Sequence, residues 1–187
     1  MLVEVKVQSL GLDRASNTPV VILQELEGER VLPIWIGPGE ASAIAMQLAD
    51  MKFSRPLTHD LLLDVVREMG GEMSRVVITR VADSTYYAEL VIQSGDEMVT
   101  VDARPSDSIA VALRSDARIF ANDSLLERAS IEITEEEASP GVTSMGDVAA
   151  GESEEEEDSE QDSFADAEEL KEYLRRLNPE DFGRFSP

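Results

Sequence analysis

The chain has 187 residues, a hydrophobic content of 42% and a formal net charge of −23. It has no cysteine and one histidine, His59, which excludes disulfide bonds, thiolate zinc sites, a cysteine nucleophile and a cage of several histidines. No apolar run reaches the roughly 20 residues that cross a bilayer, and the alternating N-terminus does not resemble a signal peptide. We therefore expect a cytoplasmic protein without a membrane partner, whose chemistry rests on carboxylates, arginines, hydroxyls and backbone.

Three strands and two helices are predicted in the first half of the chain. The strands fall near residues 3–10, 19–26 and 30–36, where β-branched residues are bounded by turn sequences. Pro38 suits the first turn of a helix, and a second helix is expected from about Thr58, as its N-cap, to Met69. We expect core positions for Trp35, for Met46, Met51 and Met69, and for the apolar face of the second helix, Leu61, Leu62, Val65 and Met69.

The second half repeats this order of elements. Strands are predicted near residues 73–80, 86–93 and 97–103, helices near 105–114 and 123–129, and a last short strand at 131–133. The segment 32–45 matches 99–112 at a constant offset of 67 residues, with a Pro-started turn and an acid two residues later in both copies. The predicted fold is α+β: two β-β-β-α-α repeats, residues 1–70 and 71–134, sharing one curved, barrel-like mixed sheet with helices packed on it.

The last 53 residues have a different character. Residues 1–134 have a charge balance of −9, whereas residues 135–187 have one of −14. Eight of the eleven residues from 152 to 162 are acidic, so we expect a disordered linker over 135–162. A possible capping box at Ser163 and an apolar stripe predict a short helix and a docking-like segment over 163–187. The interpretations left open are a protein partner, a nucleic-acid mimic and a solvated solubility tail.

Three segments resemble the bifunctional nuclease family, a DNase/RNase domain of bacteria and plants. They are Leu-Pro-Ile-Trp-Ile-Gly from Leu32 to Gly37 followed by Glu40-Ala41, Arg-Pro-Leu-Thr-His-Asp-Leu-Leu from Arg55 to Leu62, and Asp-Ala-Arg-Pro-Ser-Asp from Asp102 to Asp107 followed by Ile109-Ala110. The resemblance covers residues 1 to about 133. It implies two similar halves and an activity on DNA and RNA phosphodiesters, and therefore a nucleic-acid partner.

The site assignments come from the chemistry of the residues. Phosphodiester hydrolysis needs charge neutralisation and an activated water, for which carboxylate-bound Mg²⁺ or Mn²⁺ is an economical solution here. Asp102 ends a predicted strand and Asp107 lies in the first turn of the next helix, a spacing that can bring both carboxylates to one point. We interpret Asp102, Asp107, His59 and Asp60 as candidate catalytic residues, Arg55, Arg104 and Ser106 as candidate substrate-binding residues, and Asp102, Asp107 and Glu40 as candidate metal ligands.

Each of these residues also has a purely structural interpretation. Glu40 and Asp107 are acids in a first helical turn, where the helix dipole favours them. Arg104 could simply pair with Asp102 or Asp107, and His59 could decorate the first turn of its helix. The acidic body also argues against a non-specific nucleic-acid binder unless folding gathers its arginines.

Two functions follow from these alternatives. The first is a metal-dependent nuclease that hydrolyses DNA and RNA. The second is a non-catalytic anion- or protein-binding regulatory module with an acidic partner-docking tail. A homo-oligomer is a further expectation, because a curved sheet with helices mostly on one face leaves apolar surface to cover.

Overall fold

The computed structural model describes residues 1–13, 16–129, 164–165 and 172. Seven strands form one mixed sheet in the order β3-β2-β1-β7-β4-β5-β6, and the two-residue strand β8 pairs with β1. The strands are β1 (Leu2–Asp13), β2 (Thr18–Glu25), β3 (Val31–Trp35), β4 (Gly71–Ala82), β5 (Thr85–Ser94), β6 (Glu97–Ala103), β7 (Arg118–Asn122) and β8 (Phe164–Ala165). The sheet is not closed, with β3 and β6 at its edges, so the barrel-like form that we expected is not confirmed.

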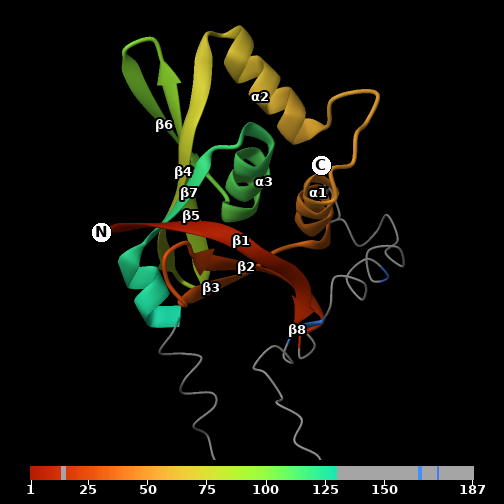
Figure 1. The fold of residues 1–187 in the computed structure, drawn as a ribbon, viewed down its shortest axis with the longest axis vertical. Coiled ribbons are helices and arrows are strands. Elements are labelled where there is room, and N and C mark those ends of the chain that lie inside the picture. Colours follow the sequence, from red (N-terminus) through yellow and green to blue (C-terminus); the bar gives the residue numbers. More distant parts are fainter. Residues whose placement is uncertain (14–15, 130–163, 166–171, 173–187) are drawn as a thin grey trace, which may run out of the picture.

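Each half of the chain begins with a three-stranded antiparallel meander followed by a helix (Figure 1). The helices are α1 (Pro38–Leu48), α2 (Thr58–Glu68) and α3 (Pro105–Ser115), and a further helical segment covers residues 123–129. The six predicted strands of the meanders and all four predicted helices are therefore confirmed. The acidic linker, the strand at 131–133 and the C-terminal helix lie outside the described residues.

Strand β7 was not predicted, and it joins the two halves. It follows α3, pairs antiparallel with β1 and pairs parallel with β4. The second half is therefore not the plain β-β-β-α-α unit that the sequence predicted, because a strand separates its two helices. Ile119 and Ala121 of β7 are buried, so this short strand forms part of the core as well as the sheet.

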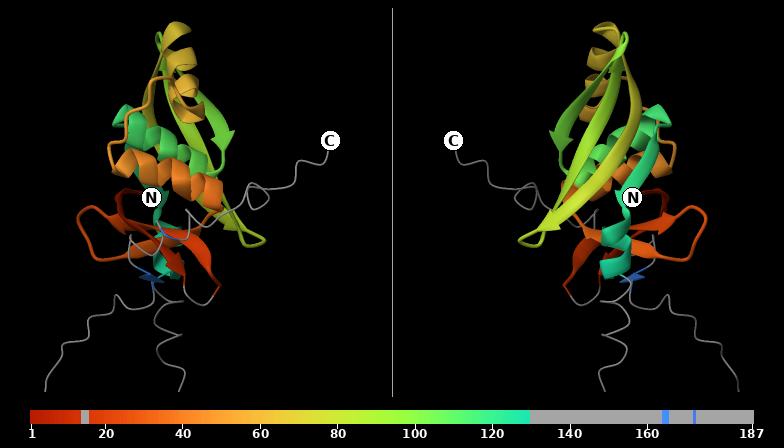
Figure 2. Two further views of the ribbon diagram at one scale, coloured as in Figure 1. Left: turned by 90° about the vertical axis from the view of Figure 1, so that its right-hand side faces the viewer. Right: turned by 90° about the vertical axis from the view of Figure 1, so that its left-hand side faces the viewer.

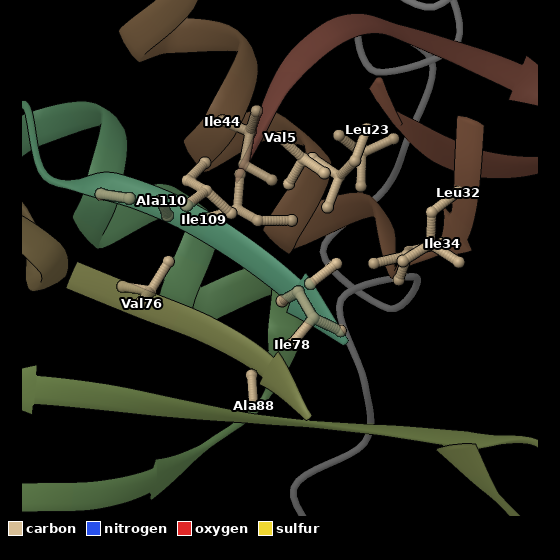
Figure 3. Close-up of a cluster of buried hydrophobic side chains, with 14 of the residues drawn as sticks. Val5, Leu23, Leu32, Ile34, Ile44, Val76, Ile78, Ala88, Ile109 and Ala110 are labelled. Carbon is tan, nitrogen blue, oxygen red and sulfur yellow. The ribbon is translucent and has the colours of Figure 1, made fainter. Parts of the chain in front are cut away.

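One hydrophobic core spans both halves. Helices α1 and α3 lie side by side across the sheet (Figure 2). Ile44 of α1 and Ile109 of α3 are fully buried, and Figure 3 shows them among side chains from both meanders, including Val5 and Val76. Burial of these side chains is the main force that holds α1 and α3 together, at roughly 1.5–3 kcal/mol for each large aliphatic residue.

Helix α2 is turned differently from the sequence prediction. Leu63 is its buried residue, and the predicted inner face is exposed: Leu61, Leu62, Val65 and Met69. Trp35 and Met51 are also about half exposed, so their expected core positions are wrong; Trp35 instead donates a hydrogen bond to Asp13. Apolar periodicity identified the helix, but the sequence could not show which face has a partner.

Candidate functional site

Each of the three long helices carries an acid at its third position. The residues are Glu40 in α1, Asp60 in α2 and Asp107 in α3. Acids are favoured there because the first backbone N–H groups of a helix lack intrahelical partners and the helix dipole attracts negative charge. Asp60 does cap its own helix, since it accepts a hydrogen bond of 2.9 Å from the backbone N–H of Leu57. Leu57, and not the predicted Thr58, is thus the N-cap residue.

The other two acids meet at Arg104, the N-cap residue of α3. Arg104 Nε and Nη2 donate to Asp107 Oδ2 and Oδ1 at 2.7 and 3.2 Å, and Nη1 donates to Glu40 Oε1 at 2.7 Å. Gly37, the N-cap residue of α1, makes room for this arrangement, because a Cβ there would clash with the Glu40 carboxylate. A guanidinium therefore links the first turns of α1 and α3.

His59, near the start of α2, completes this network. Its Nε2 lies 3.2 Å from Asp107 Oδ1, and its side chain is 15% exposed. An ionised carboxylate can only accept, so Nε2 must carry the proton. Neutral His59 is then left with Nδ1 as its basic nitrogen. We call Glu40, His59, Arg104 and Asp107 the Arg104 network.

The electrostatics of the Arg104 network favour an ionised Asp107. Burial of the Asp107 carboxyl would by itself raise its pKa, but hydrogen bonds from Arg104 and His59 outweigh burial, so the pKa of Asp107 lies below its ordinary value. The hydrogen bond to Asp107 likewise raises the pKa of Arg104. Asp107 therefore stays charged and can orient the His59 ring at neutral pH.

A second cluster of contacts, centred on Arg114, lies close to the first turn of α2. Arg114, whose side chain is only 4% exposed, donates from Nε to Asp60 Oδ1 at 2.9 Å. It also donates to the carbonyl oxygens of Ala110 and Ala43. One buried arginine thus joins α1, α2 and α3, and it holds the first turn of α2, which carries His59. We did not assign Arg114 to the site from the sequence, because its burial has no sequence signature.

The remaining candidates lie apart from the network or line a neighbouring cleft. Asp102 is exposed on the edge strand β6, opposite Glu89, and its carboxylate makes no hydrogen bond or ion pair with a described residue. Ser106 is buried at 6% exposure, so its hydroxyl does not face a substrate. Arg55 is exposed and lines a cleft together with Asp60 and Arg114.

The three predicted metal ligands are not assembled into one shell. Arg104 lies between Glu40 and Asp107, and no hydrogen bond or ion pair among the described residues joins Asp102 to either of them. Across the described parts of the chain, no group of three or more His, Cys, Asp or Glu side chains is placed to hold a metal ion. This donor set does not fit the predicted carboxylate-held Mg²⁺ or Mn²⁺, so we assign no step to a metal. In the same residues, no helix is both long and apolar enough to span a membrane.

The fold and site define a mixed α+β domain with a histidine–aspartate–arginine network at the N-terminal ends of helices α1, α2 and α3. A family model described as the bifunctional nuclease domain matches residues 21–134, and the chain belongs to this family. It is 35% identical to an uncharacterized protein of Mycobacterium tuberculosis over 96% of this chain and 97% of that protein.

Plant relatives carry the nuclease name. The chain is 28% identical to bifunctional nuclease 2 of Oryza sativa subsp. japonica, over 63% of this chain and 38% of the rice protein. It is 29% identical to bifunctional nuclease 2 of Arabidopsis thaliana, over 58% of this chain and 34% of that protein. The matched part of each plant protein is therefore little more than a third of its length.

Proposed function

We propose that this protein is a nuclease that hydrolyses phosphodiester bonds of DNA and RNA, with His59 as its acid–base residue. The observation that carries the proposal is the hydrogen bond between His59 and Asp107, whose carboxylate is itself fixed by Arg104. A base oriented by a third group is the usual arrangement for activating a nucleophile. Membership of the bifunctional nuclease family supports the same reaction class.

The chemistry uses three residues. His59 Nδ1 accepts a proton from the attacking water, whose oxygen forms the new bond to phosphorus. The bond from phosphorus to the leaving sugar oxygen breaks, and that oxygen takes up a proton from solvent water and leaves as a hydroxyl. Asp107 stabilises the imidazolium that forms, because Nε2 donates to its carboxylate. Arg104 is 65% exposed and has donors left after its three hydrogen bonds, so it can stabilise charge on the phosphate oxygens.

The test is a cleavage assay on labelled single-stranded DNA and RNA with highly purified protein. His59→Gln should lower the rate about 10²- to 10⁴-fold, the usual contribution of a general base. Asp64→Asn serves as the control on the same helix, because Asp64 is exposed and paired only with Arg67 among described residues. Cleavage that survives His59→Gln would contradict the assignment, and binding without cleavage would favour the non-catalytic module.

A requirement for Mg²⁺ or Mn²⁺ stays a prediction from the sequence. The same assay tests it by adding EDTA and then titrating each ion back. Loss of cleavage with EDTA, restored by the ion, would support the requirement and would mean that ligands other than the proposed triad of carboxylates are recruited. The cytoplasmic location, a homo-oligomer and a protein partner for the C-terminal segment likewise stay predictions.

A further inference from the structure

A cleft of about 330 Å³ is lined by residues of α1, of the loop that leads to α2 and of the start of α2, together with Arg114 of α3. Its apolar lining includes Met46, Met51 and Phe53, and its cations include Lys52 and Arg55. The volume is at the lower end of the range for small-molecule sites. We call this feature the loop cleft. The loop that forms it arches between α1 and α2 in Figure 1.

The charged side chains of the loop cleft differ in whether they bind other groups of the protein. Asp60 and Arg114 bond to each other and to backbone groups, so they belong to the scaffold. Arg55 makes no hydrogen bond or ion pair with a described residue, and Lys52 has one pair at 4.0 Å to Asp50, with both side chains more than 80% exposed. Such an exposed pair contributes little. Arg55 and Lys52 can therefore pair with an anion at the edge of the apolar lining of the cleft.

The loop cleft is connected to the proposed catalytic residue through the first turn of α2. Asp60 lines the cleft, and the residue before it, His59, bonds to Asp107. The Arg104 network sets two carboxylates against one guanidinium, and that guanidinium already bonds to both of them, so the network by itself attracts a phosphate chain only weakly. The attraction needed to bring a polyanion to His59 must come from neighbouring cations, and Lys52 and Arg55 supply it.

We propose that the loop cleft binds one unstacked nucleotide of a single-stranded nucleic acid. The base packs against Phe53 and Met51, and the phosphate pairs with Arg55 and Lys52. The next phosphodiester along the strand then lies toward His59. A base in a duplex is stacked and paired on both sides, so it enters the cleft only at the cost of flipping out. This inference rests on the proposed nuclease function and names its substrate class as single-stranded chains.

The first test measures binding alone. Isotope-labelled full-length protein is titrated with AMP, adenosine and inorganic phosphate, and NMR shifts are followed at the backbone of residues 46–60. We expect AMP to bind most tightly, because it carries both the base and the phosphate. Arg55→Ala should weaken AMP and phosphate at least about tenfold and leave adenosine nearly unchanged. Phe53→Ala should weaken AMP and adenosine about fivefold or more and leave phosphate nearly unchanged.

Matched variants separate recognition from folding. Arg67→Ala removes the same charge from an exposed site on α2 outside the cleft and should leave AMP binding within about twofold. Phe53→Tyr keeps the ring, and Arg55→Lys keeps the charge, so each should retain most of the binding that the alanine variant loses. Melting temperatures of all variants show whether the fold is intact.

The second test measures cleavage of matched single-stranded and duplex substrates. The wild type should prefer the single strand at least about tenfold, and Phe53→Ala should reduce that preference. Failure of AMP to shift residues 46–60, or equal binding by wild type, Phe53→Ala and Arg55→Ala, would overturn the loop-cleft proposal even if cleavage occurs. Specific AMP binding without cleavage would retain the cleft and overturn the nuclease proposal.

Discussion

At the scale of single residues, Arg104 binds two acids of the site and keeps one of them, Asp107, ionised by lowering its pKa. It occupies the N-cap of α3, where the first half of the chain has Gly37, and its guanidinium reaches acids from two helices. The two matching turns thus have different roles: Gly37 leaves space for the Glu40 carboxylate, and Arg104 supplies the cation that binds it. The result is an ionised Asp107 that can orient His59.

The lowered pKa of Asp107 predicts a pH-dependent stability difference. Ionised Asp107 stabilises the folded chain at neutral pH, and this contribution is lost as the pH falls through a folded-state pKa below 3.8. Asp107→Asn should therefore have a lower Tm than wild type at pH 7, and the difference should shrink toward pH 3. Asp64→Asn, at an exposed pair, should show a much smaller effect.

Thermal unfolding monitored by circular dichroism between pH 3 and pH 7 measures both variants. A Tm difference between wild type and Asp107→Asn that stays constant over this range would show that the ion pairs of Asp107 do not stabilise the fold. His59 and Arg104 remain in place in this variant, so the asparagine removes the negative charge while keeping the approximate shape of the side chain.

At the scale of elements, the position of α2 depends on a polar contact more than on apolar packing. Only Leu63 of α2 is buried, whereas Asp60 pairs with Arg114 of α3, which also bonds to the backbone of α1. The sequence pattern identified an amphipathic helix, yet its apolar row is exposed. A buried arginine with three acceptors therefore sets where His59 lies.

Loss of Arg114 should loosen α2. We expect Arg114→Met to cost about 2–3 kcal/mol, because it leaves the Ala43 carbonyl and Asp60 without their partner. Arg67→Met, at an exposed pair, should cost less than about 0.5 kcal/mol. Urea unfolding gives both values, and hydrogen exchange should show the largest loss of protection in α2. Equal effects of the two variants would contradict the proposed role of Arg114.

At the scale of the whole molecule, strand β7 makes the two halves one cooperative unit. It pairs with β1 from the first half and β4 from the second, and its inward residues lie in the common core. The helices α1 and α3 cross the same junction and bring their first turns together at Arg104. The site is therefore located where the halves join, and neither half contains it alone.

A core substitution in β7 should affect both halves together. Ile119 is 6% exposed, so Ile119→Ala should cost about 2–4 kcal/mol. Hydrogen exchange should then increase in parallel in β2 and β5, which lie on opposite sides of β7. Val99→Ala on the exposed edge strand β6 should cost less than about 1 kcal/mol. Increased exchange confined to the second half would contradict a single cooperative unit.

The sequence by itself determined the local elements and the chemical content of the site. Periodicity, turn residues and the Pro-started turns predicted the six strands of the two meanders and the four helices. The matching segments singled out Glu40, Asp102, Arg104 and Asp107. These features are local, because hydrogen bonding within an element and its end effects depend on neighbouring residues. Met51, an isolated apolar residue in a polar loop, was a signal for the loop cleft that we interpreted as core.

Tertiary structure alone decided which of these groups meet. It placed β7 at the junction, turned the apolar row of α2 outward, buried Arg114, and left Asp102 outside the Arg104 network. It also put a guanidinium between two acids that the sequence had suggested as metal ligands. Such contacts join residues far apart in the sequence, 64 positions for Arg104–Glu40 and 71 for Arg114–Ala43. They depend on the packing of whole helices against a shared sheet, which no local pattern encodes.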